Sequence, residues 1–275
     1  MHVLRQTALV AACIFAFSSA TTAQNQQRGQ PQPAKPAPYK PVTVTAPQAI
    51  NDAALEALRK QLGEVAQNKD RAALAKLVVG QGFFWIGEKG DRADKRRSGI
   101  DNLAAALGLK NKDGAGWDML ASFADDPTGA PLRDRKNVTC VPADPTFDGK
   151  AFNDLLTSTK TDAGDWAYPV SADVEVRAVP QANGPVIEKL GSVFVRIATE
   201  NTSNPPTFLR VVTPSGKTGF VSVDSVAPIG NDQLCYVKEA GDWKIGGYVG
   251  AGDVPQNSMP VRYFTPAGAR DRYLN

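Results

Sequence analysis

Near residue 165 the spacing of apolar residues changes from a helical period to the two-residue alternation of β-strands. Before this point, Leu55, Leu58 and Leu62 recur three or four positions apart, which predicts one face of a helix. After it come short alternating runs separated by turn residues: ADVEVRAV, SVFVRIAT, FLRVVT, TGFVSV, QLCYVKE and DWKIGGYV. We therefore predict an α+β protein in which a helical N-terminal region is followed by a small antiparallel β-barrel or sandwich.

Residues 48–160 are predicted to form a mainly helical domain with long loops. Asn51 or Asp52 can cap a first helix, Asp70 a second, and Asp148 a last one. Ser98 with Asp101 matches a capping box. The apolar run GFFWIG, residues 82–87, predicts either a buried strand or a loop that plugs the core. Residues 165–250 are predicted to be the β domain.

The first residues are expected to be a signal peptide, residues 1–23. The apolar run TALVAACIFAF has the length of a secretory signal core, and small residues follow it, so cleavage after Ala20 or Ala23 is predicted. A lipoprotein signal with its lipidated cysteine at Cys13 is the alternative. The mature chain is then expected to be periplasmic or secreted, without a transmembrane segment.

Two further segments are expected to lack regular structure. Residues 24–47 are rich in Gln, Pro and Ala, which predicts a disordered or polyproline-like linker. Such a linker would serve as a tether, or its prolines would serve as an SH3-ligand motif. Residues 251–275 are predicted to be a polar C-terminal tail.

Signal cleavage would leave two cysteines, Cys140 and Cys235, in an oxidising compartment. Their simplest state is a disulfide that closes a loop of 95 residues (235 minus 140). In the chain-entropy model, such a bridge contributes on the order of 4 kcal/mol to the free energy of unfolding. Two separate buried thiols are the alternative.

The tripeptide Gly216-Lys217-Thr218 matches the end of a phosphate-binding P-loop. A P-loop needs a glycine five positions before its final Gly-Lys, and it needs a helix after it. Val211 occupies the first of these positions, and the alternating run TGFVSV follows in place of a helix. We therefore predict that residues 214–217 form the tight turn of a β-hairpin, in which Gly216 adopts a positive φ.

Residues 173–227 resemble the bacterial SH3 (SH3b) domains of exported proteins. The resemblance rests on VEVR followed by Pro180, and on the runs VIEKLG, FLRVV and GKTGFV at residues 186–191, 208–212 and 216–221. Phe208 and Phe220 stand where the family often has tryptophan. The resemblance implies an SH3-like β-barrel in a bacterial exported protein.

A second resemblance covers the N-terminal region and the last strand. KDRAALAKLV followed by GFFW is similar to the opening of NTF2-like domains, and DWKI at residues 242–245 is similar to their last strand. Under this resemblance the SH3-like strands would be an insertion, and the protein would be a pocket protein.

The residue content argues against several classes of function. Signal cleavage would remove His2, the only histidine, so a Ser-His-Asp triad, a Cys-His pair and an HExxH zinc site are excluded. A net charge of +3 is too small to indicate a nucleic-acid partner. We predict that the protein is not an enzyme and uses no cofactor and no metal.

Two groups of charged residues keep an alternative open. Glycoside hydrolysis needs only two carboxylates, and Asp125, Asp126 and Glu200 could supply them, although each lies in an ordinary turn context. The basic residues 95–97 form either a solvated loop or an anion site. An enzyme based on carboxylates therefore remains an alternative.

Aromatic residues in the β region are the preferred candidates for binding. We predict an exposed aromatic site at Trp166 and Tyr168, before the first strand of the resemblance, with Phe208 and Arg210 nearby. The predicted function is a non-catalytic binding or scaffold module of the bacterial cell envelope. It would recognise peptidoglycan or an envelope protein through the SH3-like domain.

Overall fold

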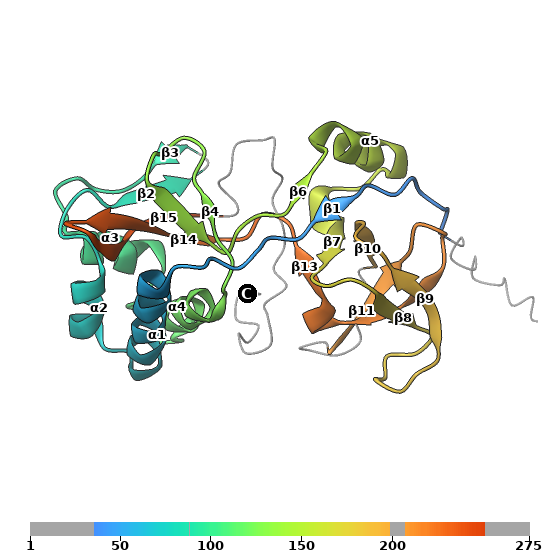
Figure 1. The fold of residues 1–275 in the computed structure, drawn as a ribbon, viewed down its shortest axis with the longest axis horizontal. Coiled ribbons are helices and arrows are strands. Elements are labelled where there is room, and N and C mark those ends of the chain that lie inside the picture. Colours follow the sequence, from blue (N-terminus) through green and yellow to red (C-terminus); the bar gives the residue numbers. More distant parts are fainter. Residues whose placement is uncertain (1–35, 88, 199–206, 251–275) are drawn as a thin grey trace, which may run out of the picture. The chain divides into compact units, whose positions relative to one another are not determined.

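The computed structural model describes residues 36–87, 89–198 and 207–250 (Figure 1). These residues form five α-helices and three sheets with mostly antiparallel pairing, which confirms the α+β class. The predicted signal peptide, residues 24–35 of the linker and the C-terminal tail lie outside the described residues. No helix among the residues described is long and apolar enough to cross a membrane.

Four of the five helices begin at the capping residues that the sequence predicts. Asp52 accepts hydrogen bonds from the backbone N–H groups of Ala54 and Leu55, and Asp70 caps the next helix in the same way. Ser98 and Asp148 cap two more. The five helices are α1 (Ala53–Asn68), α2 (Arg71–Leu77), α3 (Gly99–Ala106), α4 (Ala115–Asp125) and α5 (Gly149–Thr159).

A six-stranded mixed sheet has the strand order β3-β2-β15-β14-β5-β4. Only β2 and β15 are parallel, and GFFWIG supplies β2, a strand rather than a loop plug. The strands are β2 (Phe84–Gly87), β3 (Gly90–Asp91), β4 (Ala130–Pro131), β5 (Val138–Val141), β14 (Gln233–Glu239) and β15 (Asp242–Val249). Residues 142–232 thus leave and re-enter this sheet between two neighbouring strands, so the sheets do not follow the expected boundary near residue 160.

Helices α1 to α4 cover one face of the mixed sheet (Figure 1). Alternation along β14 places Leu234 and Tyr236 on the helical side, where they pack with Leu62, Leu120 and their neighbours. Cys235 points to the other face and pairs in register with Cys140 of β5. The two sulfur atoms are 2.00 Å apart, so the predicted disulfide is present and clips the two strands that flank residues 142–232.

A seven-stranded antiparallel sheet is built from residues 166–228, in the order β13-β7-β10-β11-β12-β8-β9. Its strands are β7 (Trp166–Pro169), β8 (Val174–Arg177), β9 (Val186–Leu190), β10 (Val195–Ile197), β11 (Phe208–Val212), β12 (Thr218–Ser222) and β13 (Val226–Pro228). Because β13 and β9 are edge strands, the pairing does not close the expected barrel.

The two faces of the seven-stranded sheet differ in their surroundings. One face is an aliphatic core around Val176, Leu209 and Val221. The other, which we call the outer face, carries Trp166 and Val212. Around Trp166 and Val212, the outer face is covered by α5 and by residues 39–44. Their buried side chains and those of the sheet form one hydrophobic core.

Residues 36–47 are an ordered part of the fold, although we expected a disordered linker there. Tyr39, Val42 and Val44 are buried in the core of the outer face. Strand β1 (Val44–Thr45) pairs with β6 (Thr146–Phe147). The segment is ordered because its three large apolar side chains bury their surface against the aromatic core of the outer face, despite the surrounding prolines.

Candidate functional site

A half-exposed row of side chains crosses three strands on the outer face. Arg210 of β11 lies opposite Phe220 of β12, and Phe220 lies opposite Arg177 of β8. Residues directly opposite one another in antiparallel strands project from the same face. Phe208 lies on this face two residues before Arg210, and all four side chains are partly exposed. We call these four residues the Arg–Phe row.

The structure separates the four predicted site residues into two pairs. All four lie on the outer face, because Trp166 pairs with Arg196, and Arg196 pairs with Val212 of β11. Trp166 and Tyr168, however, have exposed fractions of 0% and 3%. The expectation of an exposed aromatic site at these two residues is therefore wrong, because α5 and the N-terminal segment cover this end of the sheet.

Trp166 is fixed in the core by polar and aromatic contacts. Its indole N–H donates to the Thr161 hydroxyl at 2.8 Å, and the Tyr39 ring meets it edge-on with centroids 4.9 Å apart. Burial raises the pKa of the Tyr39 and Tyr168 hydroxyls far above the usual value, so both remain neutral. This end of the outer face is therefore an aromatic core.

The other two predicted residues, Phe208 and Arg210, belong to the Arg–Phe row. Phe220 and Arg177 are not among the residues predicted for the site. Phe220 could have been predicted, because the tight turn at residues 214–217 fixes the hairpin register and places Phe220 beside Arg210. The position of Arg177 depends on the pairing of β8 with β12, which joins segments more than 40 residues apart and leaves no local signal in the sequence.

Arg177 is held in place by its neighbours. Its guanidinium donates to the Gly184 carbonyl at 2.6 Å and forms an ion pair with Glu175. The exposed side chain of Val186 lies opposite Arg177 on β9. The row thus presents two guanidinium groups, of which that of Arg177 is paired with Glu175, beside aromatic surface. Guanidinium groups suit carboxylates, and aromatic faces suit the apolar faces of sugars.

The P-loop-like stretch is a hairpin turn, as the sequence predicts. Gly216 has a φ of 78°, and the Thr213 and Ser215 hydroxyls both donate to Glu188, at 3.0 and 2.7 Å. Lys217 lies 3.6 Å from the same carboxylate. Lys217, which stands where a P-loop has its phosphate-binding lysine, is therefore paired with the Glu188 carboxylate.

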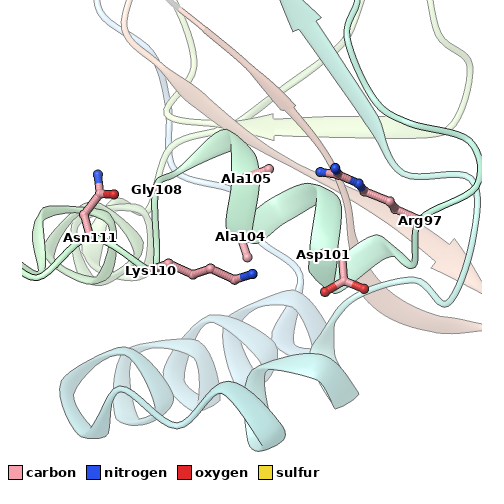
Figure 2. Close-up of a pocket in the computed structure, with 7 residues that line it drawn as sticks. All are labelled: Arg97, Asp101, Ala104, Ala105, Gly108, Lys110 and Asn111. Carbon is pink, nitrogen blue, oxygen red and sulfur yellow. The ribbon is translucent and has the colours of Figure 1, made fainter.

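A hollow of about 380 Å³ lies along α3 (Figure 2). Figure 2 shows the Lys110 side chain extending toward Asp101 of α3, with Arg97 in the loop that precedes this helix. Asp101 accepts a hydrogen bond from Ser98 and pairs with Arg71 at 2.5 Å, and these contacts lower its pKa. The lining is completed by Ala104, Ala105, Gly108 and Asn111.

The predicted basic cluster next to this hollow is neutralised locally. Arg96 binds Asp94 through two nitrogen atoms, at 3.1 and 3.2 Å, and Arg97 lies 3.6 Å from the same carboxylate. Buried Asn102 fixes the loop by accepting from the Asp94 backbone N–H and donating to its carbonyl. This arrangement favours the solvated loop over an anion site.

Two buried polar atoms belong to residues on the helical side of the mixed sheet, Tyr236 of β14 and Arg59 of α1. Within the described residues, the Tyr236 hydroxyl and the Nε of Arg59 have no hydrogen-bond partner. Another nitrogen of Arg59 donates to the Ala124 carbonyl at the end of α4, at 2.9 Å. Burial raises the pKa of Tyr236, so its hydroxyl is a neutral donor. An acceptor placed beside either atom would satisfy it.

The carboxylates and possible metal ligands of the described residues form no further site. Across residues 36–87, 89–198 and 207–250, no group of three His, Cys, Asp or Glu side chains could hold a metal ion. Asp125 is the last residue of α4 and Asp126 follows it directly. The Asp126 carboxylate accepts from the backbone N–H and the hydroxyl of Thr128, at 2.7 and 2.6 Å. Glu200 lies outside the described residues.

Comparisons with known proteins identify no relative: no family model, no curated protein and no solved structure matches this chain.

Proposed function

We propose that this chain is a non-catalytic, exported binding protein of the bacterial cell envelope that recognises peptidoglycan through the outer face of an SH3-like domain. The observation that carries the proposal is the Arg–Phe row, in which Arg210, Phe220 and Arg177 stand side by side and partly exposed. Peptidoglycan combines sugar rings, which stack on aromatic faces, with peptide carboxylates, which bind guanidinium groups.

The strand order supports the SH3-like part of this proposal. The last strand, β13, returns to pair with the first, β7, and β10, β11 and β12 form a meander between turns. This connection pattern is suited to a small barrel-like sheet. The disulfide supports export, since such bonds persist in oxidising compartments.

The test is co-sedimentation of residues 24–275 with purified peptidoglycan sacculi. Phe220→Ala and Arg210→Gln are expected to weaken binding at least about tenfold, because each removes a central contact. Arg96→Gln is the matched control, since this arginine is 90% exposed and lies on another part of the chain. Thermal melts confirm that the variants remain folded.

Two results would contradict the proposal. Wild-type protein that stays in the supernatant would exclude the wall polymer and leave an envelope protein as the partner of the row. Binding that survives both substitutions would place the contact elsewhere on the chain.

A second candidate function is a pocket protein with an inserted SH3-like segment. It is favoured by the return of the chain to the mixed sheet after residue 232. It is also favoured by the Tyr236 hydroxyl and the Arg59 Nε, which have no hydrogen-bond partner among the residues that the structure describes. Two buried donors would suit a carboxylate or carbonyl acceptor. Thermal-shift assays with benzoate and decanoate test this. Stabilisation of wild type but not of Tyr236→Phe would support the pocket, and no shift with either acid would argue against it.

A further inference from the structure

The N-terminal segment 36–45, which we call the strap, binds the rest of the protein as an extended peptide would. Three backbone hydrogen bonds join them: the Tyr39 N–H donates to Pro214 at 3.1 Å, the Phe194 N–H to Val42 at 3.1 Å, and the Val44 N–H to Ser192 at 2.9 Å. Thr43 forms an antiparallel bridge with Val193. This is the pattern of strand addition, in which backbone bonds supply affinity.

Specificity in such a mode comes from the side chains that point inward. Tyr39, Val42 and Val44 have exposed fractions of 8%, 4% and 2%, whereas the residues between them, 40, 41 and 43, are exposed. The buried residues thus follow the pattern Tyr-x-x-Val-x-Val. A peptide with this pattern places the same three side chains into the same core.

Tyr39 is the anchor of the strap. Its ring packs edge-on against Trp166, and its single hydroxyl proton is shared between two backbone carbonyls, that of Val212 at 2.9 Å and that of Phe194 at 3.2 Å. Both carbonyls belong to the segments that frame the aromatic core. A phenylalanine would fill the site without this hydrogen bonding, so the site is built for a tyrosine.

The hairpin turn at residues 214–217 is shaped to admit the strap. At Gly216, a Cβ atom would lie 3.0 Å from the Pro36 carbonyl and 3.0 Å from the Pro38 nitrogen. Gly216 also has a positive φ. The glycine of the P-loop-like stretch therefore leaves room for the proline-rich chain to pass over the turn.

We propose that the groove formed by Trp166, Phe194, Val212 and the 214–217 turn is a peptide-binding site, and that the strap is its resident ligand. The ligand class is an extended peptide with the pattern Tyr-x-x-Val-x-Val preceded by proline. A partner protein that presents such a segment binds by displacing the strap. The proposal does not depend on the Arg–Phe row or on its ligand.

The experiment uses the full chain with a specific protease site inserted between Pro47 and Gln48, next to an exposed part of the connection to α1. The protein folds and forms its disulfide before cleavage turns the strap into a separate peptide. A fluorescent peptide of residues 36–47 is then added, and its anisotropy is measured. We expect saturable binding to the cleaved protein. We expect binding at least about tenfold weaker with the Tyr39→Ala peptide, because the anchor carries most of the affinity.

Two controls distinguish peptide exchange from damage. The uncleaved protein should bind the labelled peptide much more weakly, because its tethered strap competes at a high effective concentration. A peptide of the same composition in scrambled order should not bind to either form.

A second variant keeps the proposal testable if cleavage unfolds the chain. The intact Tyr39→Ala protein retains the covalent connection but lacks the anchor, so it should bind the wild-type peptide without cleavage. Exchange of straps between two copies, seen as dimers in sedimentation, would also show that the groove accepts the segment in trans. The proposal would be overturned if a folded Tyr39→Ala protein did not bind the wild-type peptide. It would also be overturned if the cleaved protein bound the Tyr39→Ala peptide as tightly as the wild-type peptide.

Discussion

At the scale of single residues, Trp166 is predicted to be an exposed binding residue, but in the structure it is fully buried. The alternating pattern correctly places it on the same face as Phe208 and Arg210. Its exposure depends on α5 and on Tyr39, which come from segments outside the strand pattern. On the same outer face, the aromatic side chain of Phe220 is therefore partly exposed, whereas that of Trp166 is a core residue.

Trp166→Ala is expected to lower the free energy of unfolding by about 3–5 kcal/mol, because it removes a fully buried ring and leaves a cavity. Chemical denaturation followed by circular dichroism measures this change. Val186→Ala, at an exposed position on β9, is the control and should change stability by less than about 0.5 kcal/mol. A Trp166→Ala protein as stable as the control would mean that the indole is not a core residue.

Gly216→Ala is expected to destabilise the protein by at least about 1–2 kcal/mol, since alanine is strained at positive φ and its Cβ would press on the strap. Gly191→Ala is the matched control. A Cβ at Gly191 has no neighbour within 4 Å, and its φ lies outside the left-handed region. Melting temperatures of the two variants test this contrast, and equal values would show that the turn tolerates a side chain under the strap.

At the scale of elements, the start of α1 is joined to the β14–β15 hairpin by Asp52. This carboxylate caps the helix, accepts from the Trp243 indole N–H at 3.1 Å, and lies 3.8 Å from Lys238. Lys238 in turn lies over the Trp243 ring. One acidic side chain thus connects residues nearly 200 positions apart, which local helix propensity cannot supply.

These contacts lower the pKa of Asp52, chiefly through the Leu55 backbone N–H, with further help from Trp243 and Lys238. A carboxylate whose pKa falls on folding stabilises the native state above its unfolded pKa of about 3.9, and this stability is lost as the pH falls through the folded value. Asp52→Asn should therefore lower the melting temperature at pH 7 and reduce the loss on acidification below about pH 4.

Melting curves from pH 7 to pH 2 for wild type, Asp52→Asn and the control Asp134→Asn, which removes an exposed carboxylate, measure this effect. If Asp52→Asn follows the wild-type acid profile, the cap does not contribute to acid sensitivity.

At the scale of the whole molecule, the disulfide joins the two strands between which residues 142–232 leave and re-enter the mixed sheet. It therefore connects the first part of that sheet to strands that the chain supplies 95 residues later. The mixed sheet should be completed only when both segments are present.

Reduction is expected to lower the melting temperature substantially, because opening a loop of 95 residues increases the entropy of the unfolded chain by an amount worth roughly 4 kcal/mol. Calorimetry with and without reductant measures the change. The double variant Cys140→Ser/Cys235→Ser should melt like the reduced protein and should not respond to reductant. Two free thiols in the native protein, or an unchanged transition, would contradict the prediction.

The sequence alone determined the local elements of this protein. Caps at Asp52, Asp70, Ser98 and Asp148 located four of the five helices in the described residues, and the alternating runs located most of the longer strands, because these signals depend on neighbours within one or two turns. The disulfide followed from the number of cysteines. The tertiary structure decided which strands share a sheet, which face of the seven-stranded sheet is covered, and that the strap is docked. Each of these features depends on contacts between segments that are distant in the sequence. The apolar pattern within one segment shows which face is buried, but not which other segment covers it.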